Sequence, residues 1–194
     1  HPQAAEVRFD HRSSAPLYIG FQAAGFVAAS AGMEGLRAAL SAGPDDSWQL
    51  LRSDRDDLGM THHRYQQYYR QVKVLTGEYI LHEQKGKIVS ANGMFHAPLN
   101  LSVQPGLSEK SALTAALNSV GSSLYLWQAS EKEQEILSGH HHGDVYPKGE
   151  LVILPPVQGS AAKSASLTWR FDIYSLEPHE RWIVFVDATT GKVL

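Results

Sequence analysis

Residues 57–74 read DLGMTHHRYQQYYRQVKV, and their tyrosines and valines are typical of a pleated, half-buried surface. The pattern predicts a long strand over Thr61–Val74. A shorter strand is expected upstream, over Trp48–Arg52, and the strand pattern resumes at Tyr79–His82 after Gly77. The middle of the chain is therefore expected to be a run of neighbouring strands.

A hairpin signal closes this region. The polar segment Gln84–Lys87 contains a glycine and precedes the apolar segment Ile88–Phe95, which is the pattern of a turn followed by a return strand. We therefore expect an antiparallel meander. Asp54, Asp56 and Asp57 cluster before a turn and are interpreted as solvated carboxylates.

The N-terminal part has a weaker signal. Residues 1–20 show no clear period and are predicted to be irregular. Alanine, leucine and methionine are frequent in Phe21–Leu40, which predicts one or two helices, although three glycines there each cost about 1 kcal/mol against alanine in a helix interior. The segment Gly43–Asp46 is a stop signal.

A boundary is predicted at Ala97–Gly106, which contains two prolines and has no helical period. Ser108 follows as a candidate N-cap, apolar residues then recur at helical spacing, and Gly121 ends the run. A second, shorter helix is expected at Glu131–Leu137.

The last third of the chain is again strand-like. Strands are predicted at Leu151–Leu154 and at Leu167–Tyr174, where apolar and polar residues alternate. Trp182–Val186 is apolar on both faces, which predicts a central strand. A turn at Asp187–Gly191 then leads into the extended residues Lys192–Leu194.

These elements predict the α+β class. The chain is expected to hold two tandem units, residues 1–100 and 101–194. Each unit would be an antiparallel sheet with a helix packed on one face.

Composition narrows the function classes. With 43% hydrophobic and 19% charged residues, the 194-residue chain is expected to be globular rather than disordered. Its net charge of −3 argues against a nucleic-acid binder. The absence of cysteine excludes disulfides, thiolate zinc sites and a cysteine nucleophile. No apolar run reaches the ~18 residues of a membrane span.

The ten histidines raise the question of a metal site. The pair His82-Glu83 lacks the second histidine four residues on that a metallopeptidase zinc helix needs. His140–His142, with Asp144, are adjacent residues interpreted as a solvated loop. His62 and His63 lie on opposite faces of a strand, and a structural role is favoured over a functional contact. No catalytic set and no metal site are predicted.

One resemblance is more specific than these general patterns. The segment Asp57–Val74 resembles the fungalysin/thermolysin propeptide (FTP) motif, in its glycine, its Thr-His and Arg-Tyr-Gln-Gln sequences and its Val-x-Val ending. The downstream pairs Glu78-Tyr79 and Asn92-Gly93 also fit. The second half resembles a PepSY domain in three segments: Tyr146–Ile153, Trp169–Tyr174 and Val184–Leu194.

The order FTP then PepSY is similar to that of the N-terminal prosequence of thermolysin-like zinc metallopeptidases. The resemblance implies two cystatin-like units and a non-catalytic propeptide. It further implies an intramolecular chaperone that also inhibits a secreted metallopeptidase until the prosequence is cleaved.

The resemblance also implies the residues that act. The C-terminal tail 187–194 would enter the active-site cleft, with Asp187, Gly191, Lys192, Val193 and Leu194 as the inhibitory residues. The alternative is a surface strand that finishes the sheet. His62, Arg64, Gln66 and Tyr68 would form a partner-docking surface, and sheet packing with internal hydrogen bonds is the alternative for them.

The implied partner is the catalytic domain of the chain's own metallopeptidase, and no nucleic acid or membrane is expected to bind. No cofactor is expected in this chain, whereas zinc and calcium are expected in the partner. The implied location is extracellular or periplasmic. The sequence begins at His1 rather than Met, so we expect that an upstream segment was removed.

Two other functions stay open. A free-standing protease inhibitor or binding module would act in trans. An enzyme or metal carrier would use the His140–His142 loop.

Overall fold

The computed structural model describes residues 4–9, 15–22, 27–137, 145–156 and 164–194. They form two compact units. The first comprises residues 1–101 and 155–165, and the second comprises residues 102–154 and 166–194. No described helix is long and apolar enough to cross a membrane.

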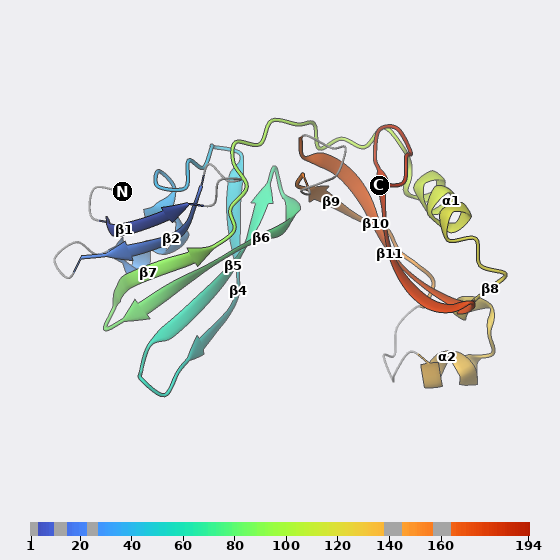
Figure 1. Ribbon diagram of the computed structural model, residues 1–194, viewed down its shortest axis with the longest axis horizontal. Helices are drawn as coiled ribbons and strands as arrows, with labels where there is room; N and C mark the ends of the chain where they lie inside the picture. Colours follow the sequence, from blue (N-terminus) through green and yellow to red (C-terminus); the bar gives the residue numbers. More distant parts are fainter. Residues whose placement is uncertain (1–3, 10–14, 23–26, 138–144, 157–163) are drawn as a thin grey trace. The chain divides into compact units, whose positions relative to one another are not determined.

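The first unit is an antiparallel sheet built around the predicted meander (Figure 1). Its strands follow the order β1-β2-β7-β6-β5-β4, and the short β3 pairs with β7. Their bounds are as follows: β1 Ala4–Phe9, β2 Pro16–Phe21, β3 Val27–Ala28, β4 Asp46–Arg55, β5 Thr61–Tyr69, β6 Val72–Gln84 and β7 Lys87–Gly93.

Two predictions for this unit were wrong, and one was confirmed in part. Residues 1–20 contain β1 and β2 rather than irregular chain. The helical segment expected within Phe21–Leu40 is present as the 3-10 helix η1 (Ala29–Leu36). Gly32 has φ +52° inside η1, and this angle interrupts the helix. Glycine adopts such a positive φ without steric cost. The expected strand Thr61–Val74 is divided by a turn at Arg70 and Gln71, whose φ values are +46° and +66°.

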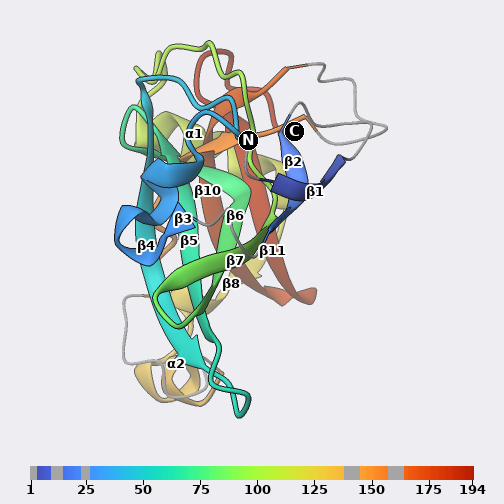
Figure 2. The same cartoon turned by 90° about the vertical axis from the view of Figure 1, so that its left-hand side faces the viewer.

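The core of the first unit lies between η1 and one face of the sheet. Met33 and Leu36 of η1 are buried with Tyr79 and Leu81 of β6 and Ile88 of β7. Figure 2 shows η1, in blue, beside β3. Among the described residues of this unit, the helical cover of the sheet is the 3-10 helix η1.

The second unit is a smaller antiparallel sheet covered by one α-helix (Figure 1). Strand β10 (Ser166–Glu177) pairs with β11 (His179–Asp187) along one edge, and with β9 (Glu150–Leu154) and β8 (Leu124–Tyr125) along the other. The remaining elements are α1 (Glu109–Val120), η2 (Leu126–Gln128) and α2 (Glu131–Leu137).

The caps of α1 are those that the sequence predicts. The Ser108 hydroxyl accepts a hydrogen bond from the Ser111 amide at 3.2 Å, and Gly121 adopts the left-handed conformation at φ +66°. The apolar face of α1 buries Ala112, Leu113 and Ala116 against a sheet core that contains Phe171, Ile173, Val184 and Val186.

The predicted central position of Trp182–Val186 was wrong. Strand β11 lies at the edge of the described sheet, and its outer side is paired near its end by an isolated bridge between Val186 and Val193. Trp182 and Ile183 are 43% and 42% exposed. Apolar residues on both faces indicated burial, but here one face packs on α1 while the other side chains stay at the surface.

Candidate functional site

The FTP-like segment starts with a turn that one carboxylate holds. Asp56 accepts hydrogen bonds on Oδ1 from the amides of Leu58 at 3.0 Å and Met60 at 2.8 Å. The Gly59 amide donates to the Asp56 carbonyl, and Gly59 has φ +80°. The Met60 amide, together with His62 and Leu58, holds the pKa of Asp56 below its usual value. Asp56 keeps 35% of its side chain exposed, so it is a solvent-accessible carboxylate that also organises the turn.

Hydrogen-bonded side chains connect this turn to three neighbouring strands. His62 Nε2 of β5 lies 3.2 Å from Asp56 Oδ2, and His62 Nδ1 lies 2.7 Å from Nδ1 of His82 on β6. Nε2 of His82 contacts the side-chain amide of Asn92 on β7. The turn, β5, β6 and β7 are thus connected by one polar network.

His63 points to the other face of β5, as its neighbour relation to His62 predicts. Its Nδ1 lies 2.7 Å from the Ser53 hydroxyl, and its Nε2 lies 2.7 Å from Glu83 Oε2. Both bonds join β5 to a neighbouring strand. The described geometry therefore gives His62 and His63 structural partners.

The proposed docking residues differ in how accessible they are. His62 and Arg64 are half-buried, with Arg64 bonded to Glu78 Oε2 at 2.8 Å, and Tyr68 is half-buried as well. Gln66, in contrast, is 3% exposed, and its amide nitrogen donates to the carbonyls of Val74 and Gly77. Gln66 is therefore part of the interior and offers no surface to a partner, contrary to the docking prediction.

Sequence reasoning did not assign a role to Gln67, which is 1% exposed. Its amide nitrogen donates to Asp46 Oδ1 and to the His96 carbonyl, and its oxygen accepts from the His96 amide at 2.9 Å. These bonds connect β4, β5 and the segment after β7. The sequence pair Gln66-Gln67 could have indicated this buried role. Side chains alternate along a strand, so one of two adjacent glutamines faces inward unless the strand bulges.

The Asn92-Gly93 pair marks a close backbone approach. A Cβ on Gly93 would lie 2.2 Å from the Glu78 carbonyl oxygen and 2.7 Å from Tyr79 Cα. The residue also has φ +151°. A side chain at this position is excluded unless β6 or β7 moves.

The C-terminal tail begins with a turn that Asp187 organises. Asp187 Oδ1 accepts from the amides of Thr189 at 3.0 Å and Thr190 at 2.7 Å and from the Thr190 hydroxyl. Burial raises the pKa of Asp187, but the Thr190 and Thr189 bonds outweigh it, so the net pKa lies below the usual value. Gly191 has φ +75° and donates to the Asp187 carbonyl.

After this turn, the tail runs back along the outer edge of β11. The Asp187 amide donates to the Lys192 carbonyl at 2.8 Å, and the Leu194 amide donates to the Phe185 carbonyl at 2.9 Å. Val193 forms an antiparallel bridge with Val186. Lys192 and Leu194 remain exposed. In this arrangement Asp187 and Gly191 shape the turn, and the last three residues run along β11 with one isolated bridge at Val193.

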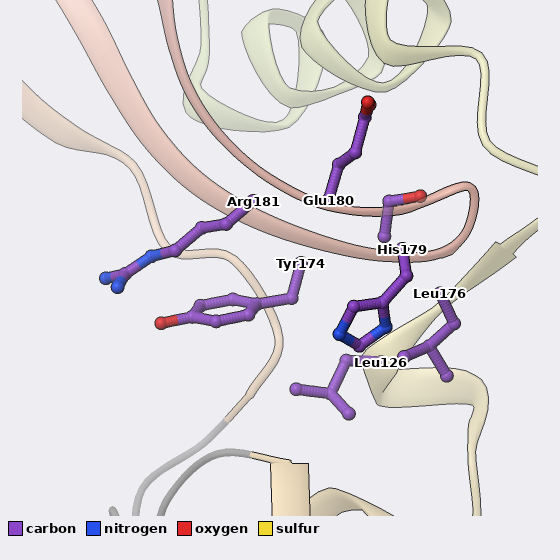
Figure 3. Close-up of a pocket in the computed structure, with 7 residues that line it drawn as sticks. Leu126, Tyr174, Leu176, His179, Glu180 and Arg181 are labelled. Carbon is purple, nitrogen blue, oxygen red and sulfur yellow. The ribbon is translucent and has the colours of Figure 1, made fainter.

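A pocket of about 260 Å³ lies at the β10–β11 hairpin (Figure 3). Its lining consists of Leu126, Tyr174, Ser175, Leu176, His179, Glu180 and Arg181. The Arg181 guanidinium stacks 4.6 Å from the centre of the Tyr174 ring and pairs with Asp172 through two bonds of 2.9 and 2.6 Å. That pair lowers the pKa of Asp172. The arginine charge is thus neutralised, and the small pocket accommodates an apolar side chain better than an anion.

The described residues contain no group of three or more potential ligands that could hold a metal ion. His140–His142 and Asp144 lie outside the described residues.

The fold and this geometry define a sheet-rich α+β protein whose predicted site residues are engaged in turns, strand pairing and internal networks. The family model of the Fungalysin/Thermolysin Propeptide Motif matches residues 46–95. The match covers about a quarter of the chain, from the first residue of β4 through β7 to the buried Phe95. The first unit therefore carries an FTP propeptide motif. The segments that resemble a PepSY domain lie outside the match.

No curated protein matches the chain. Among solved structures, the Bacillus megaterium YpeB C-terminal domain is similar, with 12% identity and a TM-score of 0.38. The likeness covers 92% of this chain and 71% of that one. A similarity at this level supports no argument about fold or function.

Proposed function

We propose that the chain is the propeptide of a secreted thermolysin-like zinc metallopeptidase and acts without catalysis of its own. It would assist the folding of the catalytic domain and inhibit it until cleavage. The observation that carries the proposal is the FTP motif at residues 46–95. In support, the motif residues Asp56, His62, Gln66 and Gly93 take part in turns, networks and close strand packing, which suits a rigid binding scaffold.

The partner in this proposal is the catalytic domain of the same precursor, which would hold the zinc and calcium ions. The second unit would be a PepSY domain, with a cystatin-like layout shared by both units. The precursor would act outside the cytoplasm. A segment linked to its target acts at an effective concentration of order mM, so a modest intrinsic affinity suffices before cleavage. As a template that binds the folding transition state, the chain would raise the folding rate.

Inhibition is assigned to the tail 187–194. Lys192, Val193 and Leu194 already run alongside β11 with a bridge at Val193, and an extended chain with a free edge can add to a cleft-edge strand through main-chain hydrogen bonds. The Asp187 turn fixes where this strand begins. His62, Arg64 and Tyr68 remain the proposed docking residues of the first unit, because each keeps part of its side chain accessible.

The test is inhibition of the mature catalytic domain by the purified chain and by a variant that ends at Gly191. The variant keeps the Asp187 turn but lacks Lys192–Leu194, and it is expected to inhibit at least about tenfold less. A matched control, Ser119→Ala on the exposed side of α1, should inhibit as the unchanged chain does. Equal inhibition by the shortened chain would contradict the tail assignment.

A second candidate is a free-standing inhibitor or binding module that acts in trans. Trp182 and Ile183 of β11 are exposed on opposite faces of the strand, where either side chain would be available to a bound partner in both candidates. An open reading frame that continues into a zinc-binding catalytic domain would support the propeptide. One that stops after Leu194 would support the trans-acting module.

A further inference from the structure

The two imidazoles of His62 and His82 face each other through the same type of nitrogen. The Nδ1 atoms are 2.7 Å apart, and the ring centres are 4.9 Å apart at 77°. The outer nitrogens are also engaged, His62 Nε2 with Asp56 and His82 Nε2 with the Asn92 amide. All four ring nitrogens therefore have a partner.

The hydrogen-bonding roles of the four ring nitrogens limit how many protons His62 and His82 can carry while they stay in contact. His62 Nε2 must carry a hydrogen to bond the Asp56 carboxylate, so in a neutral pair His62 Nδ1 accepts from His82 Nδ1. In the structure the Asn92 side-chain oxygen faces His82 Nε2, so the neutral pair requires that the Asn92 amide turn and donate to His82 Nε2. With one added proton the contact holds as placed, because the Asn92 oxygen accepts from a protonated His82 Nε2. The contact thus holds with no excess proton or with one.

A second excess proton breaks the contact. All four ring nitrogens would then carry hydrogens, and two N–H groups of like charge would point at each other across 2.7 Å without an acceptor. The same distance leaves no space for a metal ion between the nitrogens, since each zinc–imidazole bond alone needs ~2.0 Å.

The charged neighbours do not remove the conflict between two fully protonated rings. Asp56 contacts His62 from the turn, and Asp54 of β4 lies opposite His62 in register while paired with Arg52 at 3.0 Å. On β5, Arg64 is paired with Glu78 of β6. On β7, uncharged side chains face His82: Asn92 by contact and Ser90 by register. No carboxylate among these contacts is bonded to His82.

We propose that His62 and His82 form a one-proton clasp that makes the first unit sensitive to mild acid. The unfolded chain binds two protons at these residues when the pH falls below the ordinary histidine range, whereas the folded clasp binds one. Acid therefore favours unfolding or local opening of the β5–β6–β7 face. The inference concerns the chain by itself and does not depend on the proposed peptidase partner.

The first measurement is a titration of the ¹⁵N-imidazole signals of the full, unmodified chain by NMR. The clasp predicts two separated steps for His62 and His82, with the second step accompanied by loss of the folded signals of β5–β7. Two independent single-proton titrations with the folded signals intact would overturn the proposal.

The second measurement compares the unfolding equilibrium constant at pH 7, 6 and 5 in the unchanged chain and in His82→Gln. A difference of one bound proton between the folded and unfolded chain changes this constant about tenfold per pH unit. Between pH 6 and 5, the unfolding constant of His82→Gln should therefore rise about tenfold less than that of the unchanged chain. His63→Gln is the control. His63 bonds Ser53 and Glu83 on the other face of β5 and takes no part in the clasp, so this variant should keep the acid effect of the unchanged chain. An unchanged acid effect in His82→Gln would also overturn the proposal.

Discussion

Gly93 shows how strictly one residue of the FTP motif is constrained. Gly93→Ala places a Cβ 2.2 Å from the Glu78 carbonyl oxygen, so β6 and β7 must separate. We expect a loss of about 3 kcal/mol in the free energy of unfolding, measured by urea denaturation. The control is Gly86→Ala, where φ is +77° but the space is open, with an expected loss of about 1 kcal/mol. Equal losses at the two positions would contradict the close-approach account.

His96 gives a separate pH prediction. Burial lowers its pKa, because the charged imidazole is poorly solvated there. The unfolded chain therefore takes up the proton first as the pH falls through about 6.5, and the stability contributed by neutral His96 is present above that pH and lost below it. His96→Gln should reduce the acid loss of stability between pH 7.5 and 5 in urea denaturation. A steeper loss in the variant would show that the sign is wrong.

Single residues were predictable where one local interaction dominates. Ser108 and Gly121 were identified as caps because a capping hydroxyl and a left-handed glycine act within one turn of the chain. The roles of Asp56 and Gln67 were not predicted, because their partners come from several strands and the sequence does not show which strands meet. His62 and His63 were correctly placed on opposite faces, since strand alternation is a local property.

At the scale of elements, α1 allows a direct test of its cap. Ser108→Ala removes the acceptor for the Ser111 amide, and about 1 kcal/mol of stability should be lost. Ser119→Ala, at an exposed position inside α1, should lose nothing, because alanine is the better helix former. Thermal unfolding of both variants measures the difference. Similar stability of the two variants would contradict the capping role.

The errors among the elements have separate physical causes. Strands β1 and β2 were missed because β1 is mostly exposed and lacks a buried alternation. The helical segment η1 is shorter than the expected Phe21–Leu40 and is kinked, because Gly32 takes a positive φ of +52° inside it. Strand β11 was assigned to the sheet centre from its composition, yet it lies at the edge, because apolar content indicates burial but not which neighbours provide it.

For the whole molecule, the sequence was sufficient to predict the meander, the first α-helix and the strands β9, β10 and β11 of the second unit, whereas β8 was not predicted. The sequence also led to the FTP resemblance, and the family model matches the same region, residues 46–95. How the tail is engaged was not predictable, since whether Lys192–Leu194 project or return along β11 depends on long-range pairing with Phe185 and Val186.

The central claim is that this chain acts by binding a folded metallopeptidase domain rather than by chemistry of its own. Calorimetric titration of the purified chain with its own mature catalytic domain tests the claim most directly. The account predicts saturable binding at one chain per catalytic domain. No detectable binding at concentrations up to about 100 μM, near the weak end of specific association, would contradict it.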